Sequence, residues 1–310
     1  MSFRNVVNDG THNAPRLRLQ SNLWVLSKLP RDGEEWSLPE KFDRIARAGY
    51  TGFEANPDNE QDADEVAQLC RERNIAIGCQ AYPWSADDLI PRIELAHRMR
   101  ADYLSAQVYG SPLARAPEIA DLLEEMTELV NDAGLPFFVE THRGRVTQDL
   151  RRTIKVIKKF PKIRFTGDFS HYVVAGEMVG GWGEEVWDAF RKIAKRCGNW
   201  HGRIGNGEQV QTDIGDGTNS MCQHFKKLWT LGMTEWLKKA RPGDVLPFFP
   251  ELGPPLYSMT DLNGREISDR WEQSLLIKRL AEEAWAEAQA AHAQGAAPET
   301  AAAGAADEPV

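Results

Sequence analysis

The sequence predicts an α/β protein built as a single-domain (β/α)8 barrel, a TIM barrel. Three observations lead to this prediction. Short apolar runs rich in β-branched and aromatic residues alternate with amphipathic segments along most of the chain. There are eight such runs, the number of parallel strands that closes this barrel. The 310 residues of the chain leave room for the roughly 250 that the fold typically needs.

The strands are expected within eight runs, at 17–26, 49–55, 75–82, 102–110, 135–142, 163–171, 199–205 and 245–253. Between them, apolar residues recur three and four positions apart, which predicts amphipathic helices. The clearest of these segments are 38–49, 64–74, 89–100, 118–134, 150–160 and 220–240. Strands that alternate with helices pair in parallel through right-handed crossovers. The alternative, an open doubly wound sheet, usually carries a GxGxxG after its first strand, and this chain has none there.

The two ends of the chain differ in composition from the middle. Residues 1–15 are polar and are expected to form a flexible arm, and the barrel is expected to span 16–285. Residues 286–310 are rich in Ala, Gly, Pro and Glu and are expected to be disordered. A long polar loop at 205–219 precedes the last predicted helix and is expected to overhang the top of the barrel.

Charge and cysteine content exclude several classes of protein. The net charge of −9 is opposite to the basic stripe that nucleic-acid binding usually needs. The first ten residues have no apolar core of a signal peptide, and no apolar run is long enough to span a membrane. The four cysteines form no CxxC pair. We therefore expect a soluble cytoplasmic protein without a cysteine-ligated zinc.

Residues that can ionise or bind a metal lie toward the ends of four successive predicted strands: Glu140, Asp168, His201 and Glu251. Alone, each could be a polar cap on a strand or a partner of a neighbouring arginine. Together they indicate a site, because the active site of this barrel lies at the carboxyl ends of its strands. Three carboxylates and one imidazole suit Mn²⁺, Mg²⁺, Co²⁺ or Fe²⁺ better than a soft metal. The sequence thus predicts one divalent ion.

Further polar residues accompany these four. His142 lies two residues after Glu140, and Arg203 lies two after His201, so each pair shares one side of its strand. His171 follows Asp168 by three residues. Arg143 and Arg145 could bind an anion, but residues at the start of a helix are more often solvated.

Several motifs resemble the sugar phosphate isomerase/epimerase group of xylose isomerase-like barrels, in the AP endonuclease 2 superfamily. They are VETHRGR (139–145), TGDFSHY (166–172), WHGRIG (200–205), PELGPP (250–255) and GFEANPD (52–58). The resemblance covers roughly residues 17–285. The motifs as a set are specific for the superfamily, but they do not specify a substrate.

The resemblance implies roles for individual residues. Glu140, Asp168, His201 and Glu251 would bind the metal, usually Mn²⁺, and Glu140 and Glu251 would also act as acid and base on either side of a sugar. Residues expected to contact the substrate are His171, Arg203, Trp24, Glu54 and Gln107. His142, beside the first ligand, is a further candidate base. Both His142 and the long loop before Glu251 differ from a plain free-ketose epimerase.

The implied reaction is metal-dependent epimerisation or isomerisation of a keto-sugar. A carboxylate, or His142, would remove a proton next to the carbonyl, and the metal and Arg203 would stabilise the enediolate. If the next carbon carries a leaving group, the same carbanion would expel it, so a lyase acting on 3-keto-O- or C-glycosides is the alternative. An endonuclease IV-like phosphodiesterase would need more metal ligands and a basic face. Expected partners are a small carbohydrate and either a second copy of the chain or a small second subunit.

Overall fold

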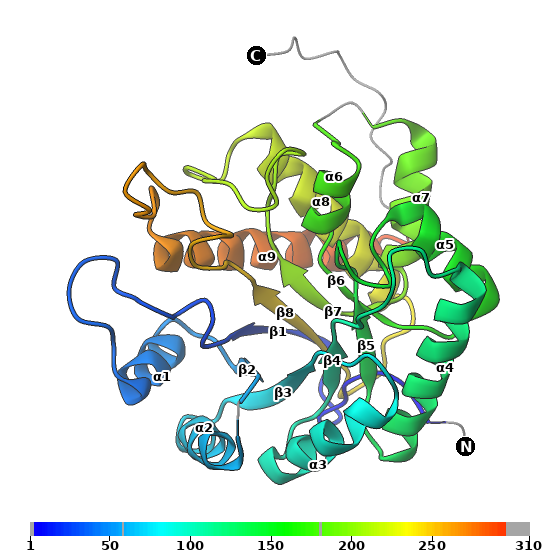
Figure 1. Ribbon diagram of the computed structural model, residues 1–310, viewed down its shortest axis with the longest axis horizontal. Coiled ribbons are helices and arrows are strands. Elements are labelled where there is room, and N and C mark those ends of the chain that lie inside the picture. Colours follow the sequence, from blue (N-terminus) through cyan, green and yellow to red (C-terminus); the bar gives the residue numbers. More distant parts are fainter. Residues whose placement is uncertain (1–2, 58, 180–181, 296–310) are drawn as a thin grey trace.

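The computed structural model describes residues 3–57, 59–179 and 182–295 and confirms the predicted (β/α)8 barrel (Figure 1). Eight parallel strands close in sequence order, and β8 pairs with β1. The strands are β1 (Arg16–Ser21), β2 (Gly52–Ala55), β3 (Ala76–Ala81), β4 (Leu104–Ala106), β5 (Phe137–Glu140), β6 (Phe165–Gly167), β7 (Cys197–Gly202) and β8 (Val245–Pro250). Six of them lie within the expected runs, whereas β1 begins one residue before its run and β7 two residues before its run.

Helices surround the barrel, as Figure 1 shows. They are α1 (Leu38–Arg47), α2 (Glu60–Glu72), α3 (Ile90–Met99), α4 (Ala116–Asp132), α5 (Leu150–Lys159), α6 (Ser170–Ala175), α7 (Glu184–Ala194), α8 (Ser220–Leu237) and α9 (Arg270–Ala293), with a short 3-10 helix at Asp87–Leu89. The periodicity that predicted them reflects burial: in α1, for example, Phe42 and Ile45 face the barrel and are fully buried. None of the helices in the described residues is long and apolar enough to cross a membrane.

The first residues are packed against the barrel, which differs from the flexible arm expected there. Asn5 brackets the start of β5: its amide donates to the carbonyl of Phe137 and accepts from the Phe137 backbone N–H, at 3.0 and 2.7 Å. Val7 is buried, and its carbonyl accepts from the N–H of Val245. Arg4 forms an ion pair with Asp244. The contacts are made by single side chains of a polar segment, which have no periodicity to detect.

The carboxyl-terminal boundary also differs from the sequence-based expectation. Helix α9 continues to Ala293, past the limit expected at 285, and Ala288 on its last turns is fully buried. An Ala-rich segment has high helix propensity, so a low-complexity composition does not by itself exclude a helix. The rest of the tail that we expected to be disordered, residues 296–310, lies outside the described residues.

The four cysteines are unpaired and buried. Burial raises the pKa of their thiols: for Cys79, to about 12. They therefore behave as small apolar side chains.

Candidate active site

The barrel brings the predicted strand-end residues to one mouth. Glu140 is the last residue of β5, His201 lies in β7, and Asp168 and Glu251 directly follow β6 and β8. All four side chains are buried, with at most 4% of any exposed. Charged groups are rarely buried so completely unless they are paired or bind a cation. This position, at the carboxyl ends of the strands, is where barrels of this kind place their chemistry.

Three of the four residues form a compact group of donor atoms. The Nδ1 of His201 lies 3.4 Å from Glu140 Oε2 and 3.1 Å from Glu251 Oε2. Among the described residues, Glu140 Oε1, His201 Nδ1 and Glu251 Oε2 have no hydrogen-bond partner. Glu140, His201 and Glu251 each offer one ligand atom within 4.8 Å of the other two.

These three residues fit a divalent ion. Buried polar atoms are almost always hydrogen-bonded, so the unpartnered Glu140 Oε1 and His201 Nδ1 indicate a missing partner. Glu251 Oε2 also lacks a hydrogen bond but is ion-paired with Arg203 at 2.8 Å. Two carboxylate oxygens and one imidazole nitrogen are ligands that Mn²⁺, Mg²⁺, Co²⁺ and Fe²⁺ accept. A cation there would also offset the cost of burying the two carboxylates.

Glu54 in β2 fixes the orientation of His201. Its Oε1 lies 2.8 Å from His201 Nε2, which directs the opposite ring nitrogen, Nδ1, toward Glu140 and Glu251. Metal-binding histidines are usually held this way, by a carboxylate on the other ring nitrogen. We expected Glu54 to contact substrate; in the structure it lines the pocket, and its carboxylate is bonded to His201.

Glu54 is in turn held by four donors that the sequence analysis did not single out. They are Gln20 (3.2 Å), Gln80 (2.7 Å), Tyr103 (2.5 Å) and Asn199 (3.0 Å). Burial opposes ionisation of Glu54, but His201 and these donors outweigh it and lower its pKa. Asn199 could have been found from the sequence, because it lies two residues before His201 and so faces the same side of β7. Nothing in the sequence marks Tyr103.

Asp168 lies beside the three-donor group, but its oxygens are engaged elsewhere. Oδ1 accepts from the backbone N–H and the hydroxyl of Ser170, at 3.0 and 2.5 Å. Oδ2 accepts from Arg203 Nε at 3.1 Å, and the same guanidinium lies 2.8 Å from Glu251. Asp168 belongs to neither group of potential metal ligands found in the described residues. Its role as a fourth ligand stays a prediction.

His142 and His171 pack against each other next to Glu140. Their ring centroids are 3.7 Å apart, and with Glu140 they form a second group of close ligand atoms. Arg143 lies 2.7 Å from His171 Nδ1. A guanidinium can only donate, so Nδ1 accepts and the proton of His171 lies on Nε2, 3.4 Å from Asp168. With its proton on Nε2, His171 is a hydrogen-bond donor rather than a metal ligand.

The pKa values of the two catalytic candidates, Glu140 and Glu251, are shifted in opposite directions. Burial, reinforced by the nearby charge of Glu251, raises the pKa of Glu140 to about 7. Burial also opposes ionisation of Glu251, but Arg203 and His201 outweigh it and hold the pKa of Glu251 below its usual range. Burial and the charge of Arg145 lower the pKa of His142 to about 3, so its ring is neutral at physiological pH. One carboxyl can thus carry a proton while the other is ionised.

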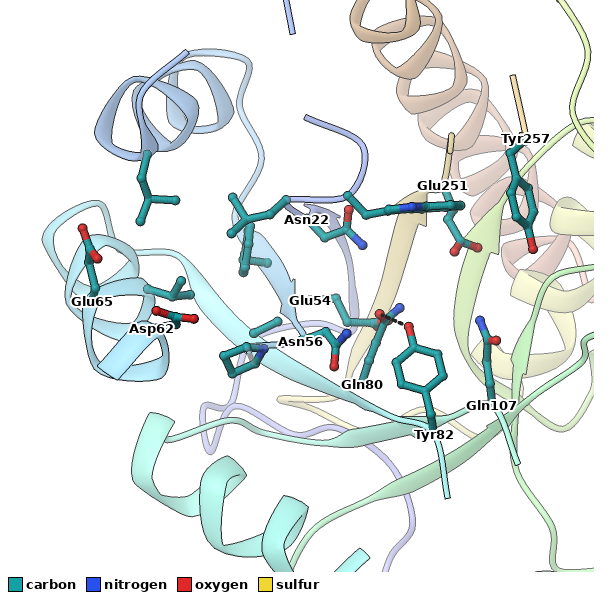
Figure 2. A pocket seen from close by; sticks show the side chains of 17 residues that line it. Asn22, Glu54, Asn56, Asp62, Glu65, Gln80, Tyr82, Gln107, Glu251 and Tyr257 are labelled. Atoms are coloured by element: carbon teal, nitrogen blue, oxygen red, sulfur yellow. Dashed lines mark hydrogen bonds between the residues drawn. The ribbon is translucent and has the colours of Figure 1, made fainter. Parts of the chain in front are cut away.

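A cavity of about 410 Å³ opens next to this centre (Figure 2). Trp24, Glu54, Gln107 and Glu251, all predicted site residues, contribute to its lining. Other lining residues were not predicted; the polar ones are Asn22, Asn56, Asp62, Glu65, Gln80, Tyr82 and Tyr257. In Figure 2, Gln107 and Tyr257 lie at the end of the pocket near Glu251, and Asp62 and Glu65 lie at the opposite end.

The long loop at 205–219 contacts the mouth of the barrel. Gln211 in this loop exchanges two hydrogen bonds with the backbone of Gly253, at 3.0 and 2.7 Å. The same amide accepts from Arg203 at 3.3 Å. The loop is therefore tied both to the segment after β8 and to a guanidinium at the candidate metal centre.

The fold and the sequence place this chain in a known class of protein. A family model described as a xylose isomerase-like TIM barrel matches residues 42–237. The chain therefore belongs to this family, which confirms the resemblance carried by the sequence motifs. No curated protein sequence matches the chain.

Solved structures with the same fold include sugar epimerases. The chain is similar to an L-ribulose 3-epimerase, with 14% identity and a TM-score of 0.59 over 92% of this chain and 100% of that one. It is similar to a D-psicose 3-epimerase from Clostridium cellulolyticum H10 with D-tagatose, with 10% identity and a TM-score of 0.53 over 89% of this chain and 99% of that one. It is also similar to a xylose isomerase-like TIM barrel protein from Mycobacterium smegmatis in complex with magnesium, with 10% identity and a TM-score of 0.55 over 86% of this chain and 97% of that one. At these identities the likeness shows the fold alone.

Proposed function

We propose that this protein is a divalent-metal-dependent epimerase or isomerase of keto-sugars that moves a proton next to a carbonyl. The observation that carries the proposal is the convergence of the buried residues Glu140, His201 and Glu251, whose ligand atoms lie within 4.8 Å of one another at the mouth of the barrel. Two of these residues are carboxylates, which can act as acid and base as well as ligands. The sugar epimerases of the same fold support a carbohydrate substrate.

Glu140, His201 and Glu251 would hold the ion, with Asp168 as the fourth ligand, and Mn²⁺ is our first choice. The solved relative with magnesium supports a divalent ion. When bound, the ion supplies positive charge that polarises a carbonyl and a neighbouring hydroxyl, which acidifies the carbon-bound proton between them.

The residues of the chain would perform the proton transfer. Glu140 and Glu251 approach His201 from β5 and β8, so a sugar bound between them would meet a carboxyl group on each face. One would take the proton and the other would return one, either to the opposite face, giving an epimer, or to the neighbouring carbon, giving an isomer. Arg203 and the Nε2–H of His171 would donate to the oxygen that gains negative charge.

A lyase acting on 3-keto-glycosides is the second candidate, and His142 is the observation that favours it. Its Nε2 lies 3.4 Å from the hydroxyl of Tyr257, a residue that lines the pocket, and its low pKa keeps the ring neutral. Elimination benefits from a base separate from the two carboxylates that flank the ion.

Proton exchange in heavy water would test the proposal. The protein with Mn²⁺ is incubated with free ketoses and 3-keto-glucosides, and the sugars are followed by NMR. Deuterium incorporation with a new stereoisomer or an aldose, and no released aglycone, is the expected result. Release of aglycone with an unsaturated keto-sugar would instead favour the lyase. No exchange in any sugar, while Glu140→Gln and wild type behave identically, would reject both.

A further inference from the structure

Two arginines at the mouth of the barrel have no acidic partner. Arg143 and Arg145 follow β5 and are half-buried, although their place in the sequence suggested solvated side chains. Among the described residues, no carboxylate lies within 4.0 Å of either guanidinium. Arg203, which is fully buried in the same mouth, has two carboxylates within this distance, those of Asp168 and Glu251. A half-buried cation without a counter-ion is costly, so this arrangement points to an anion supplied from outside.

Neighbouring side chains hold Arg145 beside the pocket. One of its terminal nitrogens donates to Gln107 Oε1 at 3.2 Å and to the Tyr109 hydroxyl at 3.3 Å. Its guanidinium carbon lies 4.0 Å from the centroid of the Tyr109 ring. Its Nε is buried and has no hydrogen-bond partner among the described residues. The side chain is thus oriented by its neighbours and keeps a donor that no neighbour uses.

Arg143 approaches the same end of the pocket from another side. It donates to His171, as described above, and its guanidinium lies 5.6 Å from the centroid of the Tyr257 ring. Tyr257 and Gln107, the pocket residues that the two arginines contact, face each other in Figure 2. The two cations therefore flank one end of the cavity.

The opposite end of the cavity has the opposite charge. Asp62 and Glu65 on α2 line it, and neither has a basic partner within 4.0 Å among the described residues. A substrate with a negative group would be repelled there and attracted toward Gln107 and Tyr257. The two acidic residues thus disfavour a negative group at their end of the pocket, and the two arginines favour it at the end near Gln107 and Tyr257.

We propose that the substrate is an anionic sugar, with a carboxylate or phosphate group bound by Arg143 and Arg145 at the end of the pocket where Gln107 and Tyr257 lie near Glu251. The inference rests on the proposed function for the reacting end of the sugar. The anion-binding end can be tested without turnover, because guanidinium groups bind carboxylate and phosphate directly.

The test is calorimetric binding of matched pairs to chelator-treated protein, so that the ligand charge cannot act through a metal. The pairs are sorbitol with sorbitol 6-phosphate, and methyl glucoside with methyl glucuronide, each up to 10 mM. We expect at least one anionic member to bind at least tenfold more tightly than its neutral partner. Which pair shows the preference distinguishes phosphate from carboxylate.

The variants assign the preference to the two arginines. Arg143→Gln with Arg145→Gln should reduce the ratio to about one, Arg145→Lys should retain part of it, and Arg151→Gln, on the exposed face of α5, should leave it unchanged. Equal affinities in wild type, no detectable binding of either anion, or a preference that survives the double variant would overturn the inference.

The two proposals can fail separately. Anion binding without proton exchange in any sugar would support the anion site at Arg143 and Arg145 and reject the proposed epimerase or isomerase activity. Proton exchange in neutral ketoses without any preference for anionic ligands would support the epimerase or isomerase activity and reject the anion site.

Discussion

Glu54 and His201 form a buried pair in which a carboxylate oxygen lies 2.8 Å from Nε2 of the imidazole. The pair joins β2 to β7 across the interior of the barrel, and it leaves Nδ1 of His201 directed at Glu140 and Glu251. The orientation of a proposed ligand, His201, therefore depends on Glu54, which is not itself a proposed ligand.

Glu54→Gln should weaken metal binding without removing a ligand. The glutamine amide has the size of the carboxylate but lacks its charge. Its NH₂ group would also face the hydrogen-bond donors that now surround Glu54. We expect affinity for Mn²⁺ to fall about 10- to 100-fold, the range typical of such supporting carboxylates. Titration calorimetry on chelator-treated protein would measure it.

Tyr103→Phe is the matched control for that substitution. It removes the 2.5 Å bond from the Tyr103 hydroxyl to Glu54 but leaves the contact between Glu54 and His201 in place. We expect a loss of metal affinity of no more than about threefold. If both variants bind Mn²⁺ as wild type does, Glu54 does not orient the ligand.

Arg4→Gln should make stability less dependent on pH. Burial opposes ionisation of Asp244, but hydrogen bonds from Arg4 and Asn8 outweigh it and lower its pKa. A lowered carboxyl pKa contributes stability that is present above the unfolded value of about 3.9 and is lost as pH falls through the folded value.

At pH 7 we therefore expect Arg4→Gln to lower the free energy of unfolding by about 1 kcal/mol. The difference from wild type should shrink as pH falls below about 4. Urea denaturation at pH 7 and pH 3 would measure it. Arg16→Gln, which loses only an exposed ion pair with Asp9, should change stability much less. A constant difference at both pH values would contradict this account of Asp244.

The last turns of α9 should stabilise the fold. A chain that ends at 285 loses the buried Ala288 and the ion pair between Glu287 and Lys226, at 3.0 Å. Compared with a chain that ends at 295, we expect it to be about 1–2 kcal/mol less stable. Both chains lack residues 296–310, so the difference between their thermal unfolding midpoints reports only on α9. Equal midpoints would show that these turns contribute nothing.

The barrel was predictable because each strand carries its own apolar run and each helix its own periodicity. The strand-end residues were predictable for a related reason, since parallel strands in a barrel end at one mouth and Glu140, Asp168, His201 and Glu251 lie at or beside the ends of successive strands. Such patterns are local in sequence, and the fold rule brings them together.

What the sequence did not reveal depends on contacts between distant residues. Glu54 and His201 are 147 positions apart, so no spacing indicates their pairing. Tyr103 reaches Glu54 because Gly78 between them has no side chain: a Cβ there would lie 2.1 Å from the Tyr103 ring. The packing of Asn5 and Val7 likewise comes from single residues in a polar segment.

The central claim is that Glu140, His201 and Glu251 hold one divalent ion, and the binding stoichiometry of Mn²⁺ tests it most directly. Chelator-treated wild type, Glu140→Gln and, as a control, Glu208→Gln in the exposed part of the 205–219 loop would be titrated by calorimetry. We expect one ion per chain for wild type and the control, and at least a hundredfold loss of affinity for Glu140→Gln. Unchanged binding in Glu140→Gln, or no binding by wild type, would contradict the claim.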